Sequence, residues 1–173
     1  MQFLAPMRKG LFGIEYINEY LKHKLNPQKE QVKLYGYEYA INDKVMQLKN
    51  NKGLEIYNGD IGYIKELHPE DKYAIIQFDD RLIKYMFEDF NELSLAYCIS
   101  IHKSQGGEFP IVFMCMTTSH FIMLKRNLAY TGVTRAKQHL VLMTDNFAMK
   151  TAIDTMDMQN RHTKLKEFLL AKD

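Results

Sequence analysis

The sequence predicts an α/β protein in which a small β domain interrupts a parallel-sheet domain. Three observations favour this class. Residues 14–25 carry apolar side chains at helical spacing, residues 43–95 alternate with the period of two typical of strands, and residues 111–116 form the continuous apolar run of a buried parallel strand. With 173 residues and 46% hydrophobic content, the chain is long enough to bury a substantial core.

The first block of the chain predicts a strand, a loop and a helix. The strand is the apolar run of residues 3–5, which Pro6 ends, and the loop runs from Met7 to Gly10. Asn26-Pro27 stops the helix, whose apolar positions are Ile14, Ile17, Leu21 and Leu25.

The middle of the chain predicts a meander or small barrel of four or five short strands, about the size of an SH3-like domain. Turn residues at 58–60 and 79–80 separate the apolar segments. The aromatic residues of this region suit either the core or the stacking of nucleic-acid bases, and we expect mainly core packing for Tyr57, Tyr63, Tyr73, Phe78 and Tyr85.

After residue 95 the α/β pattern returns. We expect buried strands at 111–116 and 139–144, a helix at 123–133, and helices after Asn146 and at 165–170. The methionines in the strand runs are predicted to fill the core: Met114, Met116 and Met143.

Charge is distributed in blocks along the chain. The net charge of +2 excludes a polybasic protein, but residues 1–53 hold 9 basic and 5 acidic groups, residues 54–93 hold 4 and 10, and residues 97–140 hold 5 and 1. The basic groups therefore concentrate on either side of the β segment, which leaves nucleic-acid binding open.

The densest polar cluster is the loop of residues 101–109. Its glycines allow a backbone to approach an anion, its Lys and Ser suit phosphate oxygens, and its carboxylate suits ribose hydroxyls. The alternative is a solvated loop between two elements. No metal site is predicted, because Cys98 and His102 lack further ligands at a useful spacing.

Two arginines suggest phosphate contacts. Arg135 lies between a predicted helix and a predicted strand, where an arginine can reach a phosphate bound on a neighbouring domain. Arg8, in the loop after the first strand, allows the same interpretation. For both residues the alternative is a surface side chain that packs its stem against the protein.

These segments resemble the motifs of RecD-type superfamily 1 DNA helicases. Residues 95–109 resemble motif V, residues 127–137 resemble motif VI, residues 4–10 resemble the motif IV region, and residues 58–62 resemble a turn of the SH3-like domain inserted between motifs IV and V. The order is that of the family, over roughly residues 1–145.

The resemblance implies a second RecA-like helicase domain, of the P-loop NTPase type without its Walker A half, formed by residues 1–38 and 94–173 with an SH3-like domain at 39–93. It implies that Arg135 and Arg8 reach the γ-phosphate of ATP, and that Gln105, Gly106 and Glu108 lie at the nucleotide, Glu108 near the ribose. It further implies contacts with single-stranded DNA by His102, Lys103, Ser104 and Thr131.

The sequence contains no GxxxxGK[ST] segment, so we expect the chain to be the C-terminal part of a longer 5′-to-3′ translocating helicase and to be inactive toward ATP by itself. ATP with Mg²⁺ would then be bound mainly by an N-terminal RecA-like domain. Other expected partners are single-stranded DNA and recombination or nuclease subunits. The alternative function is a non-enzymatic module that binds nucleic acid or protein.

The isolated cysteines and the lack of a long apolar run predict a cytoplasmic protein without membrane contact. The segment 73–80 superficially resembles a Walker B strand, but it lies in the β segment, where a hairpin is the favoured interpretation.

Overall fold

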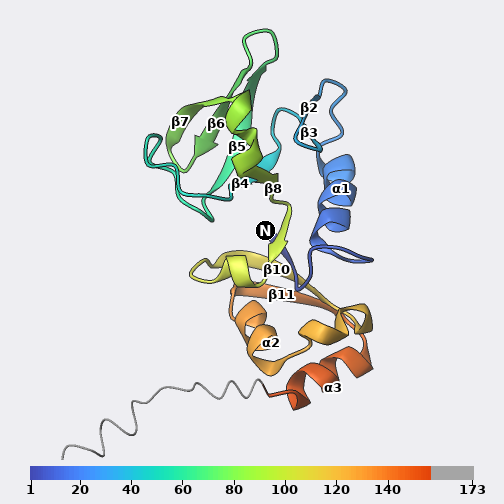
Figure 1. The fold of residues 1–173 in the computed structure, drawn as a ribbon. Coiled ribbons are helices and arrows are strands. Elements are labelled where there is room, and N and C mark those ends of the chain that lie inside the picture. Colours follow the sequence, from blue (N-terminus) through green and yellow to red (C-terminus); the bar gives the residue numbers. More distant parts are fainter. Residues whose placement is uncertain (157–173) are drawn as a thin grey trace, which may run out of the picture.

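The computed structural model describes residues 1–156 and contains two sheets with a hairpin and a long helix beside them (Figure 1). The expected α/β class with an SH3-like antiparallel segment is confirmed. The predicted helix at 165–170 lies outside the described residues. Among residues 1–156, no helix has the length and apolar character needed to cross a membrane.

The first sheet is entirely parallel, in the order β11-β10-β1-β9. Its central strand β10 (Phe109–Met116) is buried on both faces at its C-terminal end, as the apolar run predicts. The predicted first strand is β1 (Gln2–Ala5), while β9 (Cys98–Ser100) was not expected. Both cysteines are buried free thiols, and burial raises the pKa of Cys98 and of Cys115.

The prediction of a second buried strand is wrong for β11 (Ala136–Thr144). This strand is the edge of the sheet, and only one of its faces packs on the core, through Leu140 and Leu142. Val141 is 42% and Met143 38% exposed, so Met143 does not fill the core as expected. Met114 and Met116 on the neighbouring strand do.

Helices α2 (Arg126–Val133) and α3 (Asn146–Asp154) lie together against one side of this sheet (Figure 1). The predicted helix at 123–133 is shorter than expected, because residues 118–123 form the 3₁₀ helix η3 (Thr118–Met123). Asp145, rather than Asn146, caps α3 by accepting a hydrogen bond from the Ala148 amide at 2.8 Å. The same carboxylate accepts two bonds from Thr118, which ties η3 to α3.

Gly132 lets α2 approach the sheet closely, because a Cβ there would overlap the sulfur of the fully buried Met114. We expect Gly132→Ala to lower the free energy of unfolding by about 1–3 kcal/mol, as overpacking does. Denaturant unfolding checks this. Gly53→Ala is the control, since its Cβ would lie 3.5 Å from Asn51 Oδ1, and an equal loss in both variants would contradict the packing argument.

The second sheet is antiparallel, in the order β7-β6-β5-β4-β8, and has its own core. Its strands are β4 (Lys44–Gln47), β5 (Ile61–His68), β6 (Tyr73–Phe78), β7 (Arg81–Met86) and β8 (Leu93–Leu95), with the 3₁₀ helix η1 (Phe87–Glu92) before β8. The Walker B look-alike is strand β6 and its turn, as the hairpin interpretation predicts, with Asp79 at φ 48°.

The aromatic residues of this sheet divide between core and surface. Tyr85 is fully buried and Phe78 almost so, whereas Tyr57 and Tyr63 are about half exposed. Burial raises the pKa of Tyr85 to about 12. Core packing is therefore right for only part of the set.

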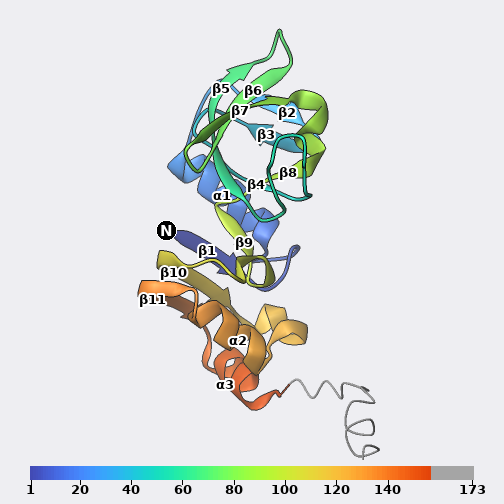
Figure 2. The ribbon, with the colours of Figure 1, turned by 90° about the vertical axis from the view of Figure 1, so that its left-hand side faces the viewer.

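Helix α1 (Ile14–Leu25) has the predicted bounds and runs beside both sheets (Figure 2). Its buried residues include two polar side chains, Asn18 and Lys22. The Asn18 amide donates to the Cys98 carbonyl and accepts from the Cys98 amide, each at 2.9 Å, so it serves as a partner for the edge of β9. A hairpin that we did not predict, β2 (Val32–Leu34) with β3 (Tyr37–Tyr39), follows the helix.

A buried network around Asp43 joins α1 to the second sheet. Asp43 is fully buried and forms a 2.6 Å ion pair with Lys22, whose side chain is 4% exposed. Its two oxygens also accept hydrogen bonds from the Asn26 side chain, the Tyr97 hydroxyl and the Ala40 amide at 2.7–2.8 Å. Lys22 also donates to the Glu38 carbonyl. The charges are thus paired and saturated with hydrogen bonds, as a buried ion pair requires.

Candidate nucleotide and DNA interface

The motif V loop (Ile101 to Phe109) leaves β9 at the C-terminal end of the sheet and begins with the 3₁₀ helix η2 (His102–Ser104). The Ser104 hydroxyl is buried and donates to the Ile101 carbonyl at 2.7 Å. Ser104 therefore stabilises the turn in this structure, and its expected contact with DNA stays a prediction. Gly106 follows at φ 83°, a conformation that glycine adopts freely.

Arg135 is held against this loop. Its guanidinium donates to the Gly107 carbonyl at 2.9 Å, to the Thr131 carbonyl at 3.0 Å and to the Thr134 hydroxyl at 3.1 Å. The Arg135 carbonyl in turn accepts from the Phe109 amide at 2.8 Å. Motif VI and the second half of motif V are thus one hydrogen-bonded unit.

Glu108 and Gln105 project from the same loop and are exposed. Glu108 forms a 3.2 Å ion pair with Lys137, and both side chains are 57% exposed. An ion pair so exposed contributes little to stability. The carboxylate of Glu108 thus remains accessible to solvent, as the predicted contact with a ribose needs.

Three predicted site residues meet in one cavity. His102, Gln105 and Thr131 line a space of about 260 Å³ between the motif V loop and α2. The Thr131 hydroxyl donates to the Asn127 carbonyl at 2.8 Å. The fold therefore brings together residues of the two motifs, such as Gln105 and Thr131, which are 26 positions apart in the sequence.

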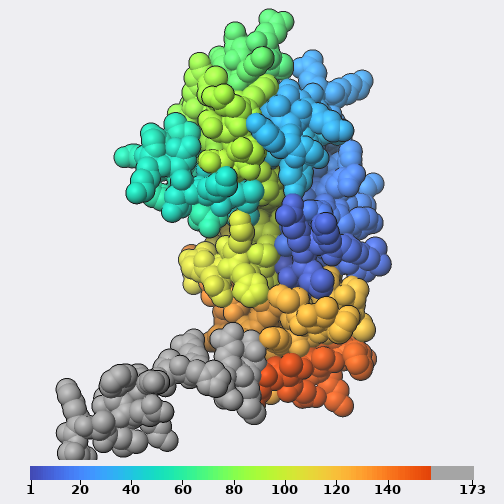
Figure 3. Space-filling model, viewed as in Figure 1, coloured from blue at the N-terminus to red at the C-terminus, as the bar shows by residue number. Residues whose placement is uncertain are grey.

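Lys103 faces a second hollow, between the motif V loop and the turn at residues 58–60 (Figure 3). Its ammonium lies 3.5 Å from Asn58 Oδ1, and burial lowers its pKa. The hollow measures about 350 Å³. Asn58, in the turn before β5, is a partner that the sequence did not predict, because no local pattern connects positions 45 residues apart.

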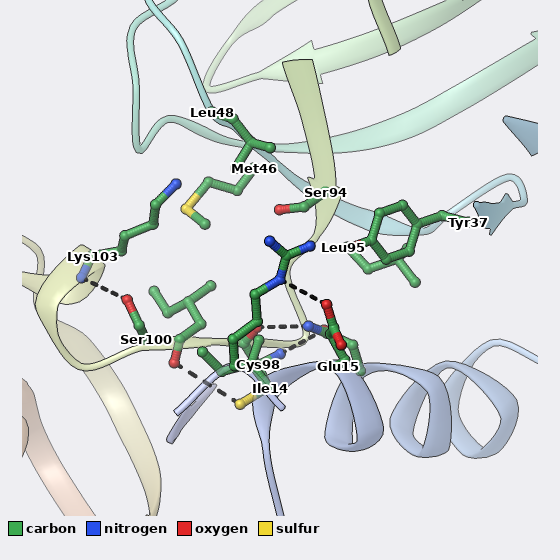
Figure 4. Close-up of a pocket in the computed structure, with 13 residues that line it drawn as sticks. Ile14, Glu15, Tyr37, Met46, Leu48, Ser94, Leu95, Cys98, Ser100 and Lys103 are labelled. Atoms are coloured by element: carbon green, nitrogen blue, oxygen red, sulfur yellow. Dashed lines mark hydrogen bonds and ion pairs between the residues drawn. The ribbon is translucent and has the colours of Figure 1, made fainter. Parts of the chain in front are cut away.

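Arg8 lies in the loop after β1, with a side chain 72% exposed. Its Nε donates to Glu15 Oε1 at 2.7 Å, and this bond is the largest of the influences that raise the pKa of Arg8. Arg8 and Lys103 also line one cavity of about 260 Å³, whose apolar lining includes Met46 and Leu95 (Figure 4). Two cations therefore share the boundary between the sheets.

Arg8 and Arg135 belong to opposite ends of the parallel strands. Arg8 follows the C-terminal end of β1, whereas Arg135 directly precedes the N-terminal end of β11, whose first residue Ala136 pairs with Phe109. Arg135 is hydrogen-bonded to the motif V loop, whereas Arg8 lines the cavity at the boundary with the second sheet. A phosphate contacted by both arginines stays a prediction.

Comparison with protein families finds two matches. Residues 95–143 match the UvrD-like helicase C-terminal domain, and residues 17–78 match the SH3 domain of ATP-dependent RecD-like DNA helicases. The first match contains the motif V loop, α2 and Arg135. The second begins within α1 and ends with β6.

Curated relatives agree with these matches. The chain is 34% identical over 137 residues to the ATP-dependent RecD2 DNA helicase of Deinococcus radiodurans, covering 79% of this chain and 19% of the relative. It is 31% identical over 170 residues to the RecBCD enzyme subunit RecD of Haemophilus influenzae, covering 98% of this chain and 25% of the relative. The chain thus spans a quarter or less of either protein.

Solved structures share the fold. A crystal structure of Bacteroides Pif1 bound to ssDNA superposes with a TM-score of 0.59 at 18% identity, covering 98% of this chain and 45% of that chain. Pif1 helicase from Candida albicans gives 0.57 at 15% identity, covering 100% and 50%. The solved structures thus support the fold, while the family matches and the curated relatives confirm the resemblance seen in the motifs: the chain is a relative of the C-terminal part of RecD-type superfamily 1 DNA helicases.

Proposed function

We propose that this chain is the C-terminal part of an ATP-dependent 5′-to-3′ DNA helicase or translocase. The observation that carries the proposal is the hydrogen bond of Arg135 to the Gly107 carbonyl, which joins the proposed phosphate-binding arginine to the loop that carries the nucleotide and DNA residues. ATP binding and DNA contact can then be coupled within one rigid unit.

Arg135 and Arg8 would stabilise negative charge on the γ-phosphate, and Gln105, Gly106 and Glu108 would border the nucleotide. The exposed guanidinium of Arg8 and the exposed carboxylate of Glu108 suit these contacts. Among residues 1–156 no group of three or more His, Cys, Asp or Glu side chains could hold a metal ion, so we assign no Mg²⁺ ligand to them. In our proposal an N-terminal RecA-like domain of the complete protein holds Mg²⁺ and most of ATP.

Single-stranded DNA is the proposed substrate, with His102, Lys103 and Thr131 as contacts and Ser104 as the residue that shapes their turn. A relative is named as a RecBCD enzyme subunit, so recombination or nuclease subunits are further proposed partners. The complete protein should hydrolyse ATP faster when single-stranded DNA is added. A complete protein whose hydrolysis does not respond to DNA would contradict the proposal.

Lys103→Ala tests the DNA contact. In the complete protein we expect weaker binding of single-stranded DNA regardless of base sequence, and a salt dependence whose slope falls by about 1, because one phosphate contact is lost. Fluorescence anisotropy at several salt concentrations measures both. Lys150→Ala, at an exposed position of α3, is the matched control, and equal slopes in the two variants would reject Lys103 as a phosphate contact.

A further inference from the structure

A buried histidine lies where the loops after β1 and β10 meet. The two strands are neighbours, and η3, which follows β10, lies against the loop of residues 7–13 that follows β1 (Figures 1 and 3). His120 in η3 is 1% exposed. Its Nδ1 accepts a hydrogen bond from the Thr117 amide at 3.2 Å, so the proton of the neutral ring belongs on Nε2.

The Nε2 atom of His120 has no hydrogen-bond partner among residues 1–156. An unpaired buried donor lowers the free energy of unfolding by about 1–3 kcal/mol. A hydrogen-bond acceptor for Nε2–H would therefore stabilise the fold. The Phe12 backbone lies near enough to influence the ring: burial, the larger influence, lowers the pKa of His120, while the interaction with the Phe12 backbone raises it. Only an acceptor favours the protonated ring, so the group is the Phe12 carbonyl.

Phe12 is itself held in an unfavourable conformation, at φ 61° in a residue with a large side chain. Its neighbour Gly13 packs tightly on the residues that it follows, since a Cβ there would lie 2.7 Å from the Lys9 carbonyl and 2.9 Å from the Arg8 oxygen. The Glu15 amide also donates to the Arg8 carbonyl at 3.1 Å. The backbone from Arg8 to Glu15, which includes Phe12, is therefore tightly folded on itself.

We infer that His120 is a positioning residue: a small closure of the loop of residues 7–13 brings the Phe12 carbonyl to the buried Nε2–H, and the hydrogen bond then fixes the loop that carries Arg8. His120 is buried in η3, which lies against the loop that holds the strained Phe12, so this one hydrogen bond would satisfy the buried donor and hold the loop in place. The inference rests on the proposed role of Arg8 in ATP hydrolysis.

Two substitutions distinguish the roles of the two ring nitrogens of His120. His120→Asn places an amide near the position of Nδ1 and does not reach Phe12, whereas His120→Gln can place an N–H near that of Nε2. In the complete protein we expect His120→Asn to lower ATP turnover about tenfold to a hundredfold, the effect of a displaced charged group, and to approach the loss in Arg8→Ala. We expect His120→Gln to stay within about threefold of the wild type.

Amide hydrogen exchange gives a second readout, independent of turnover. The Ile14 and Glu15 amides donate to the Met7 and Arg8 carbonyls, so a loosened loop exposes them. Exchange should be faster in His120→Asn and unchanged in His120→Gln.

The outcomes are distinct. Equal loop exchange in the wild type and His120→Asn, or equal defects in the Asn and Gln variants, would overturn the inference. Normal turnover in Arg8→Ala would instead overturn the proposed role of Arg8, and faster exchange in His120→Asn alone would still support the hydrogen bond to Phe12.

Discussion

Arg135→Ala in the complete protein is expected to reduce ATP turnover by about three orders of magnitude or more, with nucleotide binding largely retained. An arginine that stabilises charge during phosphoryl transfer has an effect of this size, and its loss removes a contact made mainly in the transition state. Steady-state hydrolysis and binding of a fluorescent nucleotide measure the two quantities separately.

Lys137→Ala is the matched control, because Lys137 carries the same charge two residues away and its ion pair with Glu108 is exposed. We expect its turnover to stay close to that of the wild type. Turnover at the wild-type level in Arg135→Ala would reject the phosphate contact. If nucleotide binding falls as far as turnover, the residue acts only by holding Gly107.

Asp43→Ala is expected to lower the free energy of unfolding by about 3–5 kcal/mol, the loss typical of breaking a buried ion pair. The substitution leaves Lys22 charged and buried, and removes the acceptor of the Asn26, Tyr97 and Ala40 hydrogen bonds. A loss this large is a sizeable part of the stability of an ordinary domain. Chemical denaturation of the chain followed by circular dichroism measures it.

Asp80→Ala is the control for Asp43. Asp80 is an exposed turn residue, and its loss should change the free energy of unfolding by no more than about 0.5 kcal/mol. A Lys22→Met/Asp43→Ala double variant should lose less than the sum of the two single variants, since Met leaves no unpaired charge. Additive losses would show that the ion pair contributes nothing of its own.

Much of the fold could be predicted because its strongest signals are local. Helix α1 has the predicted bounds, and strand β6 ends where the turn at residues 79–80 was predicted, since periodicity and turn residues mark these elements. The hairpin of β2 and β3 was missed because its strands have three residues each; the signal was Tyr35-Gly36, whose positive φ values of 48° and 86° suit a tight turn. The exposure of β11 was missed because an apolar run does not distinguish an edge strand from a central one.

The site could be predicted as a set of motifs, but its internal contacts could not. Nothing local indicates that Arg135 bonds to Gly107, 28 residues away, or that Asp43 pairs with Lys22. The Ser104 hydroxyl was expected to face DNA, and its burial follows from the turn that it closes with Ile101. Contacts between distant segments depend on the sheet register, which a single sequence does not reveal.

The Asp43 network determines how force passes through the molecule. Its ion pair and hydrogen bonds connect α1, the start of β4 and the segment after β8. The antiparallel sheet is therefore held against α1 by several bonds at once, which oppose rotation between the two. Any rotation of the parallel sheet should therefore carry the antiparallel sheet with it as a stiff lever arm. A small angular step at the nucleotide would appear, enlarged by the length of that arm, at the far end of the β insertion.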